Sequence, residues 1–182
     1  DIFRNGMAAP DAPFDMAWLA DTWNNAQWMR AIRNSFFIGI CATLLSTALG
    51  TLAAIGLSRS EMPYRRLIMS ILISPMIVPL VITAAGMFFF YSKIQLSQTY
   101  IGVIMAHAVL GTPFVIITVT ATLVGFDKSL VRAANSLGAG PIQTFFKVQM
   151  PLIIPGVISG GLFAFITSFD EVVAVLFLAS PE

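Results

Sequence analysis

Two adjacent carboxylates interrupt one of the most apolar stretches of the chain. Asp170 and Glu171 stand in the run ITSFDEVVAVLFL, which is otherwise uncharged. An ionised carboxylate costs about 3 kcal/mol or more inside a bilayer, so the pair needs water, a basic partner or a cationic ligand. Adjacent helical positions point about 100° apart, so both acids face one cavity only if it is wide or the helix is irregular. Two interpretations stay open: the acids line a polar vestibule, or one lies among lipid headgroups while the other caps a helix or pairs with a basic residue.

The single histidine, His107, lies in a second apolar stretch between Ala106 and Ala108. One histidine cannot assemble a metal site, and we expect it to hydrogen-bond to a neighbouring helix; the alternative is a place on a polar pathway. No HExxH, GxSxG or Walker A spacing occurs, so the chain shows no catalytic or nucleotide-binding motif of its own. Cys41, the only cysteine, lies in an apolar run and is typical of a small buried residue.

Composition assigns the chain to membrane proteins. Of its 182 residues, 57% are hydrophobic and 10% are charged, against about 25% charged residues in soluble domains. A net charge of +1 without a basic cluster argues against nucleic-acid binding. Four stretches exceed the roughly 20 residues that cross a bilayer. These predicted spans run over residues 34–58, 67–92, 100–124 and 152–178.

Basic residues predict the orientation of the spans. Six of the ten lie in or beside the segments 59–66 and 125–151, and the positive-inside rule therefore places these segments in the cytoplasm. Proline residues are expected to kink or break the second span at Pro75 and Pro79 and the third at Pro113, because proline removes a backbone donor. Such interruptions either line a cavity or bend a helix to fit its neighbours.

Residues 1–30 are predicted to form an external interfacial segment. The tryptophans Trp18, Trp23 and Trp28 suit a membrane–water interface, on a short helix over 15–29, although they would equally suit packing against a neighbouring protein. The chain begins at Asp1 without a methionine and ends soon after an apolar run. We therefore expect a fragment of a longer polypeptide.

A polar corner segment, residues 125–151, joins the third and fourth spans. Asp127 is a good N-cap for a helix over 128–137, and Gly138 is placed to end that helix in a left-handed conformation. Pro141 should begin a second helix that Pro151 interrupts at the membrane. Two helices this short must dock their apolar faces on something, either the chain's own spans or a separate subunit.

The corner segment resembles the EAA signature of ABC importer permeases. That signature has Glu-Ala-Ala, three residues, Gly, nine residues and Ile-x-Leu-Pro, and the chain has Arg132-Ala133-Ala134, Gly138 and Val148-Gln149-Met150-Pro151 at the same spacing. The flanks PFVIITVTATLVGFD and SFDEVVAVLFL are similar to the spermidine/putrescine branch of these permeases. The similarity covers nearly the whole chain, and Arg132 replaces the acidic residue of the signature.

The resemblance implies an all-α type I ABC importer transmembrane domain, incomplete at both ends, in a bacterial inner membrane. It implies no catalysis by this chain: ATP and Mg²⁺ would be bound by a separate ATPase dimer, with a second permease subunit and an external substrate-binding protein as further partners. The solute would be a small cation, most simply a polyamine, on a pathway that includes Asp170 and Glu171. The residues implied in ATPase coupling are Arg132, Ala133, Ala134, Leu137, Gly138, Ala139 and Pro151.

Other functions remain open from the sequence. Relatives with this hydropathy carry varied solutes, so the cargo would also fit an organic acid, an opine, a phosphonate or ferric ion, with the acids as gate elements. A passive channel or a membrane scaffold belongs to a different class, and an ATPase that purifies with the chain would distinguish it. Where the acid of the signature meets a basic ATPase surface, Arg132 would repel that surface, so its ionic contact is in doubt.

Overall fold

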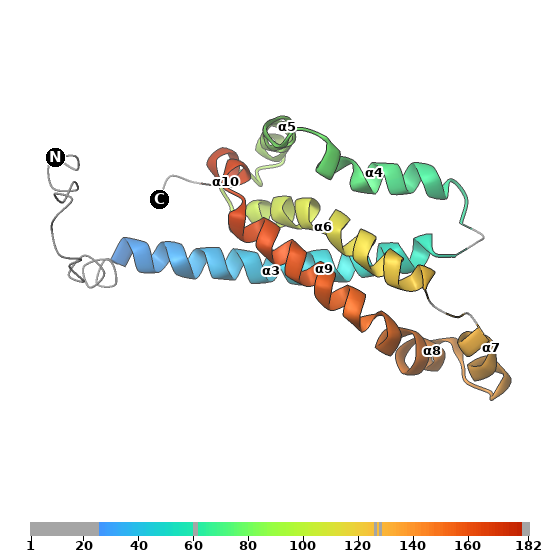
Figure 1. The fold of residues 1–182 in the computed structure, drawn as a ribbon. Helices are drawn as coiled ribbons and strands as arrows, with labels where there is room; N and C mark the ends of the chain where they lie inside the picture. Colours follow the sequence, from blue (N-terminus) through green and yellow to red (C-terminus); the bar gives the residue numbers. More distant parts are fainter. Residues whose placement is uncertain (1–25, 60–61, 126, 128, 180–182) are drawn as a thin grey trace, which may run out of the picture. The chain divides into compact units, whose positions relative to one another are not determined.

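The structure, a computed structural model, describes residues 26–59, 62–125, 127 and 129–179. Every regular element in these residues is helical (Figure 1). In chain order the elements are α3 (Ala26–Leu57), α4 (Arg65–Ile77), α5 (Leu80–Lys93), α6 (Tyr100–Val124), α7 (Ser129–Ser136), α8 (Pro141–Thr144), a π-helical turn (Phe145–Gln149), α9 (Met150–Asp170) and α10 (Val173–Leu178).

The chain divides into two units, residues 1–36 and 37–182. Of the first unit, the structure describes residues 26–36, which form the first turns of α3 and include the exposed Trp28. Trp18 and Trp23 lie outside the described residues. The external interfacial segment over residues 1–30 therefore stays a prediction.

Three helical runs are long and apolar enough to cross a membrane. They are α3, α6 and the continuous run Pro141–Asp170, which joins α8, the π-helical turn and α9. Helices α4 and α5 are apolar enough as a pair, but their axes are bent by 104°. Within the described residues, the four apolar stretches of the sequence thus fall on three long helices and one bent pair.

The bend between α4 and α5 follows from proline chemistry. Val78 is extended (φ −71°, ψ 136°) because a following proline disfavours the helical conformation, and Pro79 then caps α5. The predicted break at Pro79 is confirmed. Pro75 lies inside α4 without ending it. Its missing N–H leaves the Ile71 carbonyl without its helical donor, and the Ser74 hydroxyl donates to that carbonyl at 2.7 Å instead.

Two other prolines do not break their helices. Helix α6 continues through Pro113, whose ring is fully buried. The prediction that Pro151 ends the second short helix is wrong, because the helix passes through it into α9. The Met150 N–H reaches back five residues to the Phe145 carbonyl. This wider π turn shifts the hydrogen-bond register just before a residue that has no N–H to donate.

The predicted span over 152–178 is also not a single helix. Helix α9 ends at Asp170, Glu171 is extended (φ −82°, ψ 100°), and α10 begins at Val173. The backbone N–H of Ala174 donates to the Glu171 carboxylate at 2.8 Å. The Glu171 side chain thus satisfies an N–H in the first turn of α10, which has no acceptor from α9 to continue the helix.

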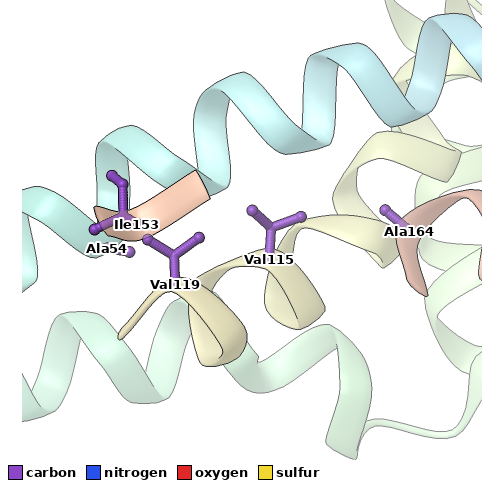
Figure 2. Packing of buried hydrophobic residues seen from close by; sticks show 5 residues of the cluster. All are labelled: Ala54, Val115, Val119, Ile153 and Ala164. Carbon is purple, nitrogen blue, oxygen red and sulfur yellow. The ribbon is translucent and has the colours of Figure 1, made fainter. Parts of the chain in front are cut away.

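The core of the second unit lies where α6 packs between α3 and α9. Figure 2 shows the buried cluster of Ala54 from α3, Val115 and Val119 from α6, and Ile153 and Ala164 from α9. Glycine makes the close approach possible on both sides of Val115. A Cβ on Gly50 would lie 2.6 Å from the Val115 Cβ, and one on Gly160 would lie 2.8 Å from the Val115 Cα. Small residues let membrane helices approach closely, because no hydrophobic force joins helices in lipid.

A second buried cluster holds α10 in place. Leu178 of α10 packs with Tyr91 of α5 and with Val103 and Ala106 of α6. The Leu178 carbonyl also accepts a hydrogen bond from the Gln98 N–H at 2.8 Å. Helix α6 therefore contributes to both clusters, one near its middle and one near its start.

Replacing Gly160 with alanine should destabilise the protein, because the added Cβ meets the backbone of α6, which cannot move without opening the core. We expect a loss of about 1–3 kcal/mol, the range for overpacking, seen as a lower midpoint of thermal unfolding in detergent. Gly86 on α5 is the matched control, since a Cβ there meets nothing within 4 Å. Gly86→Ala should be neutral or slightly stabilising, and equal midpoints for the two variants would contradict this packing.

Candidate functional site

The corner segment begins with the cap that the sequence predicts. The N–H of Ser129 donates to Asp127 Oδ1 at 2.8 Å, and α7 follows directly. The hydroxyl and the backbone N–H of Ser129 lower the pKa of the Asp127 carboxyl, with a further contribution from the positive charge of Arg132. The carboxylate that caps α7 is therefore ionised at neutral pH. Lys128, where the sequence starts this helix, lies outside the described residues.

Helix α7 ends in a Schellman turn centred on Gly138. The predicted left-handed conformation is confirmed by a φ of +84°. The Gly138 N–H donates to the Asn135 carbonyl and the Ala139 N–H to the Ala134 carbonyl, both at 3.0 Å. Two of the predicted coupling residues, Ala134 and Ala139, are thus joined through their backbones. The turn fixes the direction in which the chain leaves α7.

The second half of the corner is locked to the first. Pro141 is in the first turn of α8, as predicted. The Thr144 hydroxyl donates to the Asn135 side-chain oxygen at 3.2 Å, and Thr144 is buried. Because α8 continues through the π turn into α9, the corner is attached to the first turn of a membrane helix without a flexible joint.

Three apolar side chains of the corner segment stay exposed beside the membrane helices that the structure describes. Leu137 is 88% exposed and Ile142 is 76% exposed, and Phe146 is exposed beside them. Of the other predicted coupling residues, Ala134 and Ala139 are half-buried and the rest are exposed, namely Arg132, Ala133, Gly138 and Pro151. The sequence leaves two docking surfaces open, namely the chain's own spans and a separate subunit. The described spans do not cover these three side chains.

The two acids at the far end of α9 have different environments. Glu171 is half-buried, and its Oε1 accepts the Ala174 N–H as described above. Asp170 is exposed, and no hydrogen bond from another described residue engages its carboxylate. The predicted capping role is thus found for Glu171 and, among the described residues, not for Asp170.

A cavity of about 320 Å³ lies at these acids. Two helix interruptions meet there, since Leu80 is the first residue of α5 after the bend, and Asp170 and Glu171 mark the break between α9 and α10. Apart from the two acids and Thr167, the lining side chains are apolar, namely Leu80, Ile166, Val172 and Val173. The sequence predicted the break at Pro79 but gave no sign that it faces the acids.

His107 forms the interhelical hydrogen bond that the sequence predicts. Its Nδ1 lies 2.7 Å from the hydroxyl oxygen of Ser168 on α9, and both side chains are buried. Ser168 precedes Asp170 by two positions, a link that no sequence motif indicated. The two candidate regions lie at opposite ends of α9, with Pro151 in its first turn and Asp170 in its last, about 30 Å apart at 1.5 Å per residue.

The different environments of the acids predict different effects on backbone exchange. Glu171→Ala removes the acceptor for the Ala174 N–H, so amide exchange in α10 should accelerate about fivefold, as expected for loss of a cap worth about 1 kcal/mol. Asp170→Ala should leave α10 exchange unchanged, because that carboxylate caps nothing. Hydrogen–deuterium exchange followed by mass spectrometry of the 171–179 region measures both. Equal acceleration in the two variants would contradict the assignment of the cap to Glu171.

Comparison with known proteins agrees with the corner motif. Residues 46–182 match the family described as "binding-protein-dependent transport system inner membrane component". The spermidine/putrescine transport system permease protein PotC of Haemophilus influenzae is 30% identical over 166 residues, which cover 91% of this chain and 65% of that protein. The putrescine transport system permease protein PotI of Escherichia coli is 28% identical over 177 residues, covering 93% of this chain and 63% of that protein.

A relative with a different named solute also matches. The sulfoquinovosyl glycerol transport system permease protein SmoH of Agrobacterium fabrum is 31% identical over 149 residues, or 81% of this chain and 52% of that protein. The chain therefore spans slightly less than two thirds of the length of the polyamine relatives and about half of this one. The family match confirms the predicted resemblance, the all-helical membrane fold and the inner-membrane location, and the chain belongs to the inner-membrane components of binding-protein-dependent transport systems, the permeases of ABC importers.

Proposed function

We propose that this chain is a permease subunit that forms half of the pathway for a small polyammonium cation, with Asp170 as its contact in the cavity. The observation that carries the proposal is the Asp170 carboxylate, which accepts no hydrogen bond from another described residue and lies in a largely apolar cavity between two helix breaks. The names of the relatives PotC and PotI, which are spermidine/putrescine and putrescine permeases, support the same solute class.

The electrostatics of the cavity favour a cation over an anion. Helix α9 ends at Asp170, so the negative end of its dipole and its last carbonyl groups lie at the acids. The positive end of α5, which begins at Leu80, opposes this with about half a unit charge. The two carboxylates that line the cavity, Asp170 and Glu171, outweigh this partial charge. An anionic solute would be repelled, so the charge of the cavity supports a polyamine rather than an anion as the solute.

The opposite end of α9 supports coupling to a separate ATPase. Leu137 and Ile142 protrude from a corner whose two helices are locked by the Schellman turn and by the Asn135–Thr144 hydrogen bond. An apolar edge held this rigidly fits a groove on another protein. Because Pro141–Asp170 is one continuous helical run, a displacement of the corner would move the acids as well. ATP hydrolysis in the partner, with its Mg²⁺, would then switch the cavity between the two sides of the membrane.

Asp170→Asn should weaken cation uptake. Removing the free negative charge should raise the half-saturation concentration for putrescine or spermidine about tenfold, equivalent to about 1.4 kcal/mol, with a smaller change in maximal rate. Radiolabelled uptake into proteoliposomes that contain the assembled transporter measures both values. Glu171→Gln is the comparison, since an amide oxygen keeps an acceptor for the Ala174 N–H. Unchanged kinetics in the single variants and in the double variant would exclude a role of these acids in substrate recognition.

Gly138→Val should uncouple ATP hydrolysis from uptake. A β-branched residue at φ +84° is strained by about 1–3 kcal/mol, and relief of that strain would open the Schellman turn and redirect the exposed edge. Gly140 is the matched control, because it is extended (φ −70°, ψ 166°) and a Cβ there meets nothing within 4 Å. Gly140→Val should retain substrate-stimulated ATPase activity, whereas Gly138→Val should lose most of it. Normal uptake and stimulation in Gly138→Val would refute the coupling role.

A further inference from the structure

We propose that His107 is a positioning residue for the acid-lined break, and that it acts through Ser168 to hold Asp170 in place for the cation. This inference rests on the proposed function, because it concerns the same cavity. It begins from a hydrogen bond of 2.7 Å between two buried side chains that are 61 residues apart in the chain. His107 is 2% exposed, so neither water nor lipid replaces this bond easily.

The hydrogen bond between His107 and Ser168 lies close to the two acids along α9. Ser168 is in the last turn of α9, two residues before Asp170 and three before the extended Glu171. The end of a helix frays more readily than its middle, and a lateral tie to a neighbouring helix prevents it. The side chain of His107 therefore holds the last turn of α9 in place. Because Asp170 belongs to that turn, the same hydrogen bond fixes the direction of the Asp170 side chain.

Helix α6 holds the other side of the break from the same face. Val103 and Ala106 pack against Leu178 of α10, and His107 follows Val103 by four positions, so the three residues lie on adjacent turns of one face. Both ends of the interrupted segment are thus attached to α6, by an apolar contact on one side and by a hydrogen bond on the other. Helix α6 therefore holds the segments on the two sides of the break in place relative to each other.

The imidazole has no second partner among the described residues. Its Nε2 is buried without a hydrogen-bond partner, so all of the polar attachment of this side chain goes through Nδ1 to Ser168. Ser168 alone would not keep the tie, since without His107 its hydroxyl can donate to the carbonyl four residues earlier in its own helix.

The proposal predicts a selective loss of affinity. His107→Ala and Ser168→Ala should each raise the half-saturation concentration for polyamine about three- to tenfold, the range for one interhelical hydrogen bond, while the maximal rate stays close to that of the unmodified transporter. The double variant should be no worse than either single variant, because both remove the same bond. His107→Asn should restore affinity, since its amide places a donor and an acceptor near the position of Nδ1.

Ser46→Ala is the matched control, because Ser46 of α3 also contacts α6 next to His107. The Ser46 hydroxyl lies 2.7 Å from the Ala42 carbonyl oxygen of its own helix and 3.2 Å from the Ala108 carbonyl oxygen of α6, and neither contact reaches the break. The variant should leave the half-saturation concentration unchanged. An equal loss of affinity in Ser46→Ala would show general loosening of the helices and would overturn the proposal.

A structural readout separates this inference from the proposed function. Spin labels at two exposed residues, Val81 and Val172, report the distance between α5 and the break in the assembled transporter with Cys41 replaced by alanine. Val81 follows the cavity-lining Leu80, and Val172 lines the cavity itself. His107→Ala should broaden the distance distribution, and His107→Asn should restore it. An unchanged distribution overturns the positioning role. A broadened distribution with unchanged uptake supports the positioning role and refutes the proposed contact of Asp170 with the cation.

Discussion

The close packing of α6 between α3 and α9 is the constraint on which the second unit depends. Lipid offers helices no hydrophobic reason to associate, so their contact rests on van der Waals fit and on a few hydrogen bonds. Val115 provides that fit, because Gly50 and Gly160 leave no side chain between it and the neighbouring backbones. One face of α6 is thereby committed to these contacts, and the same helix then supplies His107, Val103 and Ala106 to the region of the acids.

The interruptions of the membrane helices follow a common rule. A bilayer satisfies no backbone group, so each interruption needs a local replacement for the hydrogen bond that it removes. The Ser74 hydroxyl donates to the carbonyl left without its helical donor by Pro75, and before Pro151 the helix widens into a π turn in which the Met150 N–H donates to the Phe145 carbonyl. At the end of α9 the Glu171 carboxylate serves an N–H of α10. The chain is interrupted between α4 and α5 and between α9 and α10, and the cavity lies where these two interruptions meet.

The helical run that contains α9 has a rigid corner at one end and two acids at the other. A Schellman turn and the Asn135–Thr144 bond hold the corner at one end, and two carboxylates stand at the break at the other. Because the run Pro141–Asp170 is continuous, the two ends are mechanically linked through about 30 residues of helix. The coupling to a separate ATPase that we propose would act through this connection.

The sequence by itself determined the features that depend on neighbouring residues. The cap at Asp127, the left-handed Gly138, the start at Pro141 and the break at Pro79 each follow from the conformations open to one residue type. The spacing of the corner motif also indicated the family. The prediction that Pro151 ends its helix was wrong, because the helix continues there after a rare π turn that no propensity predicts.

Only the tertiary structure decided which distant groups meet. The sequence predicted a hydrogen bond for His107 but not its partner, since Ser168 is 61 residues away and many hydroxyl groups lie in the spans. It also left open whether Asp170 and Glu171 share one polar vestibule or whether one of them caps a helix. In the structure Glu171 is the cap, and the Asp170 carboxylate accepts no hydrogen bond from another described residue. The two carboxylates are adjacent in the sequence, yet their environments differ. Helix packing, through α6 on both sides of the break, fixes the direction of each side chain.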